Sequence, residues 1–318
     1  MPRLTTDISQ TYKPFQFPWA MERAVTHEKM HWGEWEARLH EDLVQWNTNK
    51  LTEGEKAHIT SILRLFTQSD VEVGKNYLQV FIPYFKNNEI RAMLTSYAAR
   101  EFVHQRAYAL LNDTLGLPEQ EYSTFINEPV LADKVEFMQT QESLEPKDIA
   151  VALAQTVCNE GMSLFSAFVM LLGYQRTGKM KGTCEIVEWS IRDENTHVDG
   201  MLQLFHTHLE GNPSIVTDDF KKSIYDLFRK AVMLEDSVID LAYKDGGPVD
   251  LEPTEVKNYV RYLADRRLLQ LGMKPNFGVK ENPLPWVDWI VSGDSFKNFF
   301  EGVVTDYSTA GLVGTWEY

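Results

Sequence analysis

The stretches AAREFVHQRAY (98–108) and RDENTH (192–197) each contain a Glu-x-x-His motif, formed by Glu101 and His104 in the first and by Glu194 and His197 in the second. Residues three and four apart share one face of an α-helix, so each glutamate projects to the same side as its histidine. A single motif of this kind has little specificity on its own. Two copies in one chain predict a shared site inside a helical protein.

A lone acid precedes each motif on a helical stripe of its own. Asp70 lies 101 − 70 = 31 residues before the first motif, and Glu160 lies 194 − 160 = 34 residues before the second. Apolar residues at spacings of three and four surround all four acidic positions, which predicts the buried faces of four amphipathic helices. The apolar members include Ile59, Ile62, Leu63, Phe66, Val73 and Tyr77; Ile90, Leu94, Tyr97, Tyr108 and Leu111; Leu153, Val157, Leu164 and Phe168; and Val187, Ile191, Met201 and Leu204.

Four carboxylates that point into an apolar core need positive charge beside them, because burying an unpaired carboxylate costs several kcal/mol. Two metal ions supply that charge, and two lone acids combined with two Glu-x-x-His pairs are typical of dimetal carboxylate bundles. Oxygen-rich ligands with one imidazole for each ion favour iron or manganese over structural zinc. The alternative is a buried salt-bridge network, but the nearby basic residues fall off the stripes: Arg100, Arg106 and Arg192. Surface or packing roles are expected for the remaining histidines: His27, His31, His40, His58, His206 and His208.

The global composition excludes several other classes of function. The 318 residues carry a net charge of −15 and show no basic stripe, which disfavours nucleic-acid binding. The N-terminus has no signal-peptide core, and no stretch approaches twenty uninterrupted apolar residues, so no membrane association is expected. We expect a cytoplasmic protein whose two cysteines, Cys158 and Cys184, are reduced. One helical core is predicted, with a capping box at Thr52 and Glu55.

The motifs, taken together, resemble the small, radical-generating subunit of class I ribonucleotide reductase, called R2. The matching segments follow the family order: SDVEVGKNY (69–77), AAREFVHQRAY (98–108), NEG (159–161), RDENTH (192–197), NPLPW (282–286) and NFFEGVVTDYS (298–308). The resemblance implies an all-α, ferritin-like bundle with the dinuclear metal site in its core. It assigns 1–50 to an N-terminal arm and connecting segment, 51–290 to the helical domain, and 291–318 to a C-terminal segment and tail that docks on the large subunit.

The resemblance also implies the site and its chemistry. Tyr108, one turn beyond the first histidine, corresponds to the tyrosine that stores a stable radical, and Phe168 is expected to form part of an apolar wall around it. The metal would be two iron ions, or alternatively two manganese ions or one of each. The expected ligands are Asp70, Glu101, His104, Glu160, Glu194 and His197.

A radical formed in this subunit must leave it, because two cysteines alone offer no active site for reducing a ribonucleotide. By resemblance, the radical passes from His104 through Asp193 and Trp32 to a large (alpha) subunit that binds the substrate, although Trp35 lies only three residues from Trp32. Trp316 and Tyr318 are expected redox or docking residues in a tail that is shorter and less acidic than many in the family. A homodimer is expected, with an activating flavoprotein as a further candidate partner.

Two other functions fit part of the pattern. An R2-like dimetal oxidase or oxygenase would apply the same centre to an organic substrate. A ferritin-like storage protein would hold iron without passing on a radical, but it has no need for the segments NPLPW (282–286) and NFFEGVVTDYS (298–308). Tyr108, Asp193 and Trp32 favour the radical-generating subunit over both alternatives.

Overall fold

Four helical segments carry the predicted stripes. They are α3 (Glu53–Lys75), α5 (Asn88–Leu115), the run of α7 (Pro146–Cys158) with η4 (Asn159–Ser163) and α8 (Leu164–Leu172), and α9 (Lys181–Gly211). The structure is a computed structural model that describes residues 5–140 and 142–291, and within these ranges it contains helices and no strand. The expected all-α class is therefore confirmed.

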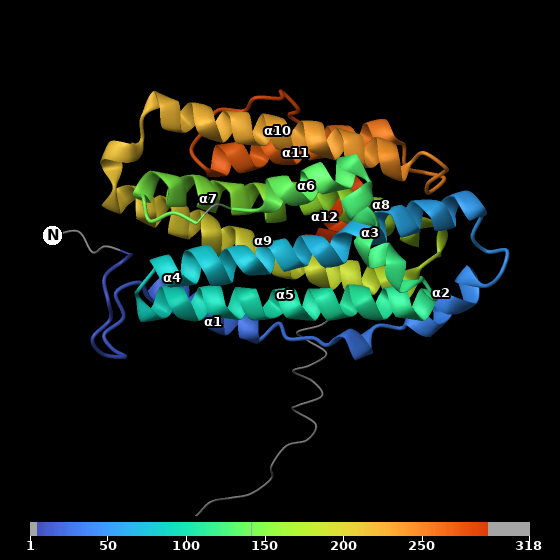
Figure 1. The fold of residues 1–318 in the computed structure, drawn as a ribbon, viewed down its shortest axis with the longest axis horizontal. Coiled ribbons are helices and arrows are strands. Elements are labelled where there is room, and N and C mark those ends of the chain that lie inside the picture. Colours follow the sequence, from blue (N-terminus) through green and yellow to red (C-terminus); the bar gives the residue numbers. More distant parts are fainter. Residues whose placement is uncertain (1–4, 141, 292–318) are drawn as a thin grey trace, which may run out of the picture. The chain divides into compact units, whose positions relative to one another are not determined.

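Further helices surround these four. They are α1 (Pro18–Glu28), η1 (Glu34–Glu36), α2 (Leu39–Trp46), η2 (Asn76–Phe81), α4 (Ile82–Tyr84), η3 (Glu119–Asn127), α6 (Pro129–Met138), η5 (Gln175–Thr177), η6 (Pro213–Ile215), α10 (Asp218–Ala242) and α11 (Pro253–Gln270). Figure 1 shows α3 and α5 side by side, with α1 along α5. Helices α7 and α9 pack together, and α10 lies against α6, α7 and α11. This arrangement buries the four stripes against one another.

Local sequence signals set the ends of the long helices. Thr52 and Glu55 form the predicted capping box, in which the Thr52 hydroxyl accepts from the Glu55 amide at 3.2 Å and the Glu55 carboxylate accepts from the Thr52 amide at 2.8 Å. Asn87 caps α5 by accepting from the amide of Glu89 at 3.1 Å. Helix α5 ends at Leu115 and is capped by Gly116, whose φ of 70° is the left-handed conformation that glycine adopts at low cost.

The helix that carries Glu160 widens into a π-helical turn, η4. Such turns free carbonyl groups from the regular ladder, and they are frequent at functional sites. The Gly161 carbonyl accepts from Nε of Arg267 at 2.9 Å, and a side chain at position 161 would collide with that guanidinium. The Ser163 carbonyl accepts from the Ser166 hydroxyl at 3.1 Å and from Nζ of the buried Lys134 at 3.4 Å. Side chains from other helices therefore stabilise the irregular turn.

The segment Pro146–Thr177 is long and apolar enough to cross a membrane by composition, but the window that meets this criterion is entirely buried in the protein. Burial of this kind is expected for the central helix of a bundle. A separate unit begins at Leu284, and its described part contains α12 (Pro285–Val291). Trp316, Tyr318 and the rest of 292–318 lie outside the described residues.

Candidate metal centre

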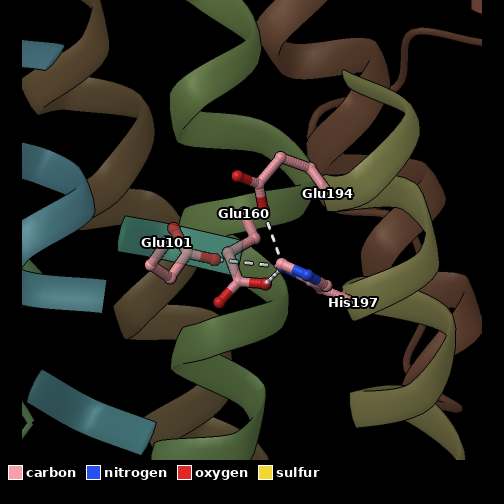
Figure 2. Close-up of side chains that lie close together, drawn as sticks. All are labelled: Glu101, Glu160, Glu194 and His197. Atoms are coloured by element: carbon pink, nitrogen blue, oxygen red, sulfur yellow. Dashed lines mark ion pairs between the residues drawn. The ribbon is translucent and has the colours of Figure 1, made fainter. Parts of the chain in front are cut away.

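The structure brings the six predicted ligands into one buried cluster. Donor atoms of Glu101, Glu160, Glu194 and His197 lie within 4.8 Å of one another, and so do donor atoms of Asp70, Glu101 and His104. None of the six side chains is more than 2% exposed. Figure 2 shows three of the carboxylates converging on the His197 ring from α5, η4 and α9.

Glu101 and Glu194 each contact both histidine rings through different oxygens. Nδ1 of His197 lies 3.1 Å from Oε1 of Glu101 and 3.4 Å from Oε2 of Glu194. Nδ1 of His104 lies 3.5 Å from Oε2 of Glu101 and 3.3 Å from Oε1 of Glu194. Glu160 lies on the His197 side, with Oε2 at 3.4 Å from Nδ1. Two carboxylates thus occupy positions between two imidazoles, which is the arrangement required to bridge two ions.

Several donor atoms in this cluster lack a hydrogen-bond partner among the described residues: Oδ2 of Asp70, both carboxylate oxygens of Glu101 and of Glu194, and Nδ1 of His197. Unsatisfied buried polar atoms are costly, and a convergent set of them is typical of a site for an ion or a water molecule. Four carboxylates and two imidazoles form the oxygen-rich donor set that suits iron or manganese. The residues present therefore fit a dinuclear metal site.

Protons compensate part of the charge in the metal-free cluster. Burial raises the pKa of Glu160 to about 8 and that of Asp70 well above its ordinary value. Burial alone would lower the pKa of His104 and His197, but the carboxylates around them outweigh it and raise both pKa values well above the usual range. Metal ions must displace these protons in order to bind.

The predicted pair Asp193 and Trp32 lies directly behind His104. Oδ2 of Asp193 accepts from Nε1 of Trp32 at 2.7 Å and lies 3.3 Å from Nε2 of His104. The rings of Trp32 and His104 stack with centroids 5.9 Å apart. Trp32 is 2% exposed and Trp35 is 69% exposed, so burial distinguishes the two neighbouring tryptophans.

Arg100 contacts Asp193, although its position off the apolar stripe does not predict this. Its side chain is 4% exposed, and its Nη1 donates to Oδ2 of Asp193 at 3.2 Å. Burial alone would raise the pKa of Asp193, but the contacts with His104 and Arg100 lower it below the ordinary value. Nε of the buried Arg192 lies 3.5 Å from the other oxygen, Oδ1, so four side chains surround the Asp193 anion. Arg100 and Arg192 fall off the predicted stripes, yet both side chains are buried and reach Asp193.

Tyr108 lies on the Asp70 side of the cluster in an apolar pocket. Its ring is 1% exposed and stacks on Phe66, with centroids 4.4 Å apart and planes 3° apart. Phe168 in turn stacks on Phe66, with the two ring centroids 5.4 Å apart. The Tyr108 hydroxyl donates to Oγ of Ser190 at 3.1 Å. Burial, followed by the charge of Asp70, raises the pKa of the phenol well above its usual value.

Three further contacts at the centre were not predicted from the sequence. Nε2 of His27 lies 3.1 Å from Nε2 of His197, the Tyr77 hydroxyl donates to both carboxylate oxygens of Glu160 at 2.9 and 3.0 Å, and Ser190 contacts Tyr108. Tyr77 already lies on a predicted stripe, so its inward orientation is expected. No local pattern marks His27 or Ser190, because their partners are distant along the chain.

Comparison with known proteins gives a consistent result. The family model for the ribonucleotide reductase small chain matches residues 9–283. A probable ribonucleoside-diphosphate reductase small subunit of Invertebrate iridescent virus 3 is 38% identical over 97% of this chain and 86% of its own length. The beta subunit of ribonucleoside-diphosphate reductase from Chlamydia pneumoniae is 31% identical over 96% of this chain and 91% of its own length.

Solved structures show the same fold at lower identity. The R2 subunit from Clostridium botulinum superposes with a TM-score of 0.82 at 22% identity, covering 89% of this chain and 91% of that one. Dimanganese(II)-NrdF from Streptococcus sanguinis superposes with a TM-score of 0.77 at 21% identity, covering 90% of this chain and 99% of that one. The Rnr4 homodimer of Saccharomyces cerevisiae superposes with a TM-score of 0.72 at 20% identity, covering 95% of this chain and 90% of that one. These likenesses confirm the ferritin-like bundle.

Proposed function

The chain belongs to the family of ribonucleotide reductase small chains, and on that basis we propose that a dimetal centre in its core generates a radical that Tyr108 stores for ribonucleotide reduction. The observation that carries this proposal is the placement of Glu101 and Glu194 between His104 and His197, with Tyr108 buried beside the cluster. The proposed ligands are Asp70, Glu101, His104, Glu160, Glu194 and His197.

Two reduced metal ions held by these six residues would, together with dioxygen or a related oxidant, supply the oxidising power. The chain contributes the surroundings of the phenol. Phe66 covers one face of the Tyr108 ring, and the side chain is almost fully buried, so water and external reductants are kept away from it. Ser190 holds the hydroxyl at a defined position.

The route out of the subunit follows the contacts behind His104. We propose that Asp193 and Trp32 relay the radical from the centre to a large subunit that binds the ribonucleotide, because one carboxylate oxygen contacts both His104 and the Trp32 indole. Despite burial, the contact with His104 and the charge of Arg100 lower the pKa of Asp193, so the carboxylate is ionised and accepts hydrogen bonds. Trp316 and Tyr318 complete the proposed route and docking tail, and alanine substitution of each followed by binding of the large subunit tests that role.

The identity of the metal and the oligomeric assembly of the chain are also proposals. Iron and manganese both suit the donor set, and the S. sanguinis relative carries manganese. We propose a homodimer, as described for the S. cerevisiae relative, that binds a large subunit. An activating flavoprotein and a cytoplasmic location stay predictions. The R2-like oxidase is less well supported, because the family match spans residues 9–283 and an oxidase has no use for the Trp32–Asp193–His104 relay.

The deciding experiment loads metal-free protein with iron(II) under dioxygen and records the electron paramagnetic resonance spectrum, with manganese as a second metal. Wild type is expected to show a tyrosyl signal, and Tyr108→Phe is expected to lack it. Tyr225→Phe is the control, because the Tyr225 hydroxyl on α10 donates an exposed hydrogen bond to the Lys274 carbonyl. A tyrosyl signal that persists in Tyr108→Phe contradicts storage at this residue. Retained ribonucleotide reduction without any tyrosyl signal would assign the stored oxidant to the metals.

A further inference from the structure

A chain of side-chain hydrogen bonds leads from His197 to the surface of helix α1. Nε2 of His197 lies 3.1 Å from Nε2 of His27, and Nδ1 of His27 lies 2.7 Å from Oγ of Ser96. The Ser96 hydroxyl donates to Oε1 of Glu28 at 2.7 Å. Both histidines are fully buried, whereas Glu28 is exposed at the end of α1. The chain thus connects the centre to a surface carboxylate.

The direction of each hydrogen bond follows from the role of His197. Its Nδ1 faces Glu101, Glu160 and Glu194, so this is the nitrogen available to a metal ion and it must then carry no proton. The proton of the neutral ring is therefore on Nε2, which donates to Nε2 of His27. The proton of His27 must then be on Nδ1, which donates to Ser96, and Ser96 donates to Glu28. Each donor meets an acceptor, and the chain ends on a carboxylate.

The two histidines of the centre are supported differently. Nε2 of His104 lies 3.3 Å from Asp193, a carboxylate that is itself fully buried and bound by Arg100. On its Nε2 side, His197 is linked to the carboxylate of Glu28 through His27 and Ser96. Glu28 and Ser96 also line an open groove between α1 and α5. The hydrogen-bond partners of His104 are therefore buried, whereas the chain of hydrogen bonds from His197 ends at the surface.

We propose that His27, Ser96 and Glu28 are positioning residues that fix the ring orientation and the proton of His197 for metal binding. The inference rests on the proposed dimetal centre. It makes the affinity of the ion on the His197 side depend on an uninterrupted chain to Glu28, while the ion on the His104 side is independent of that chain. Partners of this kind, which orient a metal-binding histidine, change metal affinity by about 10–100-fold when they are removed.

The test counts manganese(II) ions bound to the metal-free protein, from the electron paramagnetic resonance signal of the ion that stays free in solution. Wild type is expected to bind two ions for each chain. His27→Leu and Ser96→Ala break the chain of hydrogen bonds. Each is expected to lower the binding affinity of one of the two ions by about 10–100-fold, while the other ion keeps its affinity. Glu28→Gln removes only the terminal charge and is expected to give a smaller weakening of the same ion. Glu22→Gln, an exposed residue on the same helix, is the matched control and is expected to bind as wild type does.

A rescue variant separates this role from simple packing. The side-chain amide of His27→Gln can accept from His197 through its oxygen and donate to Ser96 through its nitrogen, so it preserves the direction of the chain and is expected to restore both ions. Equal loss in the leucine and glutamine variants would show a packing role and overturn the inference. Two tightly bound ions in both His27→Leu and Ser96→Ala would overturn it as well. Failure of wild type to bind manganese or iron would instead contradict the proposed dimetal centre.

Discussion

The hydroxyl of Tyr108 on α5 donates a hydrogen bond to Oγ of Ser190 on α9 over 3.1 Å, although 82 residues separate the two along the chain. Among the predicted ligands, Asp70 has the largest charge effect on the pKa of the Tyr108 phenol. Oδ2 of Asp70 has no hydrogen-bond partner in the described parts of the chain. The phenol is thus directed to a neutral hydroxyl, and Oδ2 of Asp70 is available to a metal ion.

Replacing Ser190 by alanine removes this hydrogen bond without adding volume. The buried phenol then loses its acceptor, which costs on the order of 1–3 kcal/mol of stability. We expect Ser190→Ala to form a tyrosyl radical whose g-values differ from those of wild type, because the hydrogen bond to the phenoxyl oxygen is lost. High-field electron paramagnetic resonance measures this change, and Ser190→Thr, which keeps a hydroxyl, is the control. Identical g-values in wild type and the alanine variant would show that the radical does not accept this bond.

Loss of Trp32 is expected to separate radical storage from radical transfer. Trp32→Phe keeps an aromatic ring but removes the indole N–H that Asp193 accepts. We expect metal content and the tyrosyl signal to persist, because Asp193 still contacts His104 and Arg100, and we expect ribonucleotide reduction with the large subunit to be lost. Trp35→Phe, at the exposed neighbour, should leave the reaction unchanged. Wild-type turnover in Trp32→Phe would exclude this residue from the route.

The metal-free protein is expected to lose stability as the pH rises from about 5 to about 8. Folded Glu160 has a pKa of about 8 against 4.5 for the free side chain, so in this window the folded state binds more protons than the unfolded state, and the free energy of unfolding falls with pH. The raised pKa values of His104 and His197 act in the same direction. Bound metal ions replace these protons, so the metal-loaded protein should show a much weaker dependence. Thermal unfolding at several pH values, with and without metal, measures the difference, and equal slopes would contradict it.

The buried ion pair of Lys134 and Glu235 is expected to be important for stability near the turn that carries Glu160. Nζ of Lys134 lies 2.9 Å from Oε1 of Glu235, and both side chains are about 1% exposed. Lys134→Met leaves a buried carboxylate without its partner, which costs about 3–5 kcal/mol. The double variant Lys134→Met/Glu235→Leu removes both charges and should recover much of this loss. Chemical denaturation measures both values, and a single variant as stable as wild type would show that the pair contributes little.

The local part of this protein could be predicted from the sequence because helical periodicity relates residues three and four positions apart. The stripes, the capping box at Thr52 and the inward orientation of Glu101 with His104 all follow from that spacing. The six proposed ligands were recognised for the same reason, since a buried acid on an apolar stripe is costly wherever it occurs. The resemblance that their order suggested agrees with the family match.

The tertiary structure alone decided which side chains support these residues. Contacts between His27 and His197, Ser190 and Tyr108, and Arg100 and Asp193 join helices that are distant along the chain, and their formation depends on how those helices rotate and pack. Arg100 illustrates the reason, because a long side chain off the core stripe can still reach inward once a neighbouring helix approaches. The sequence by itself therefore determined which residues could bind metal, through local helix geometry. Packing between helices determined which carboxylates lie between the two imidazoles, which hydroxyl holds the phenol, and how each histidine is oriented.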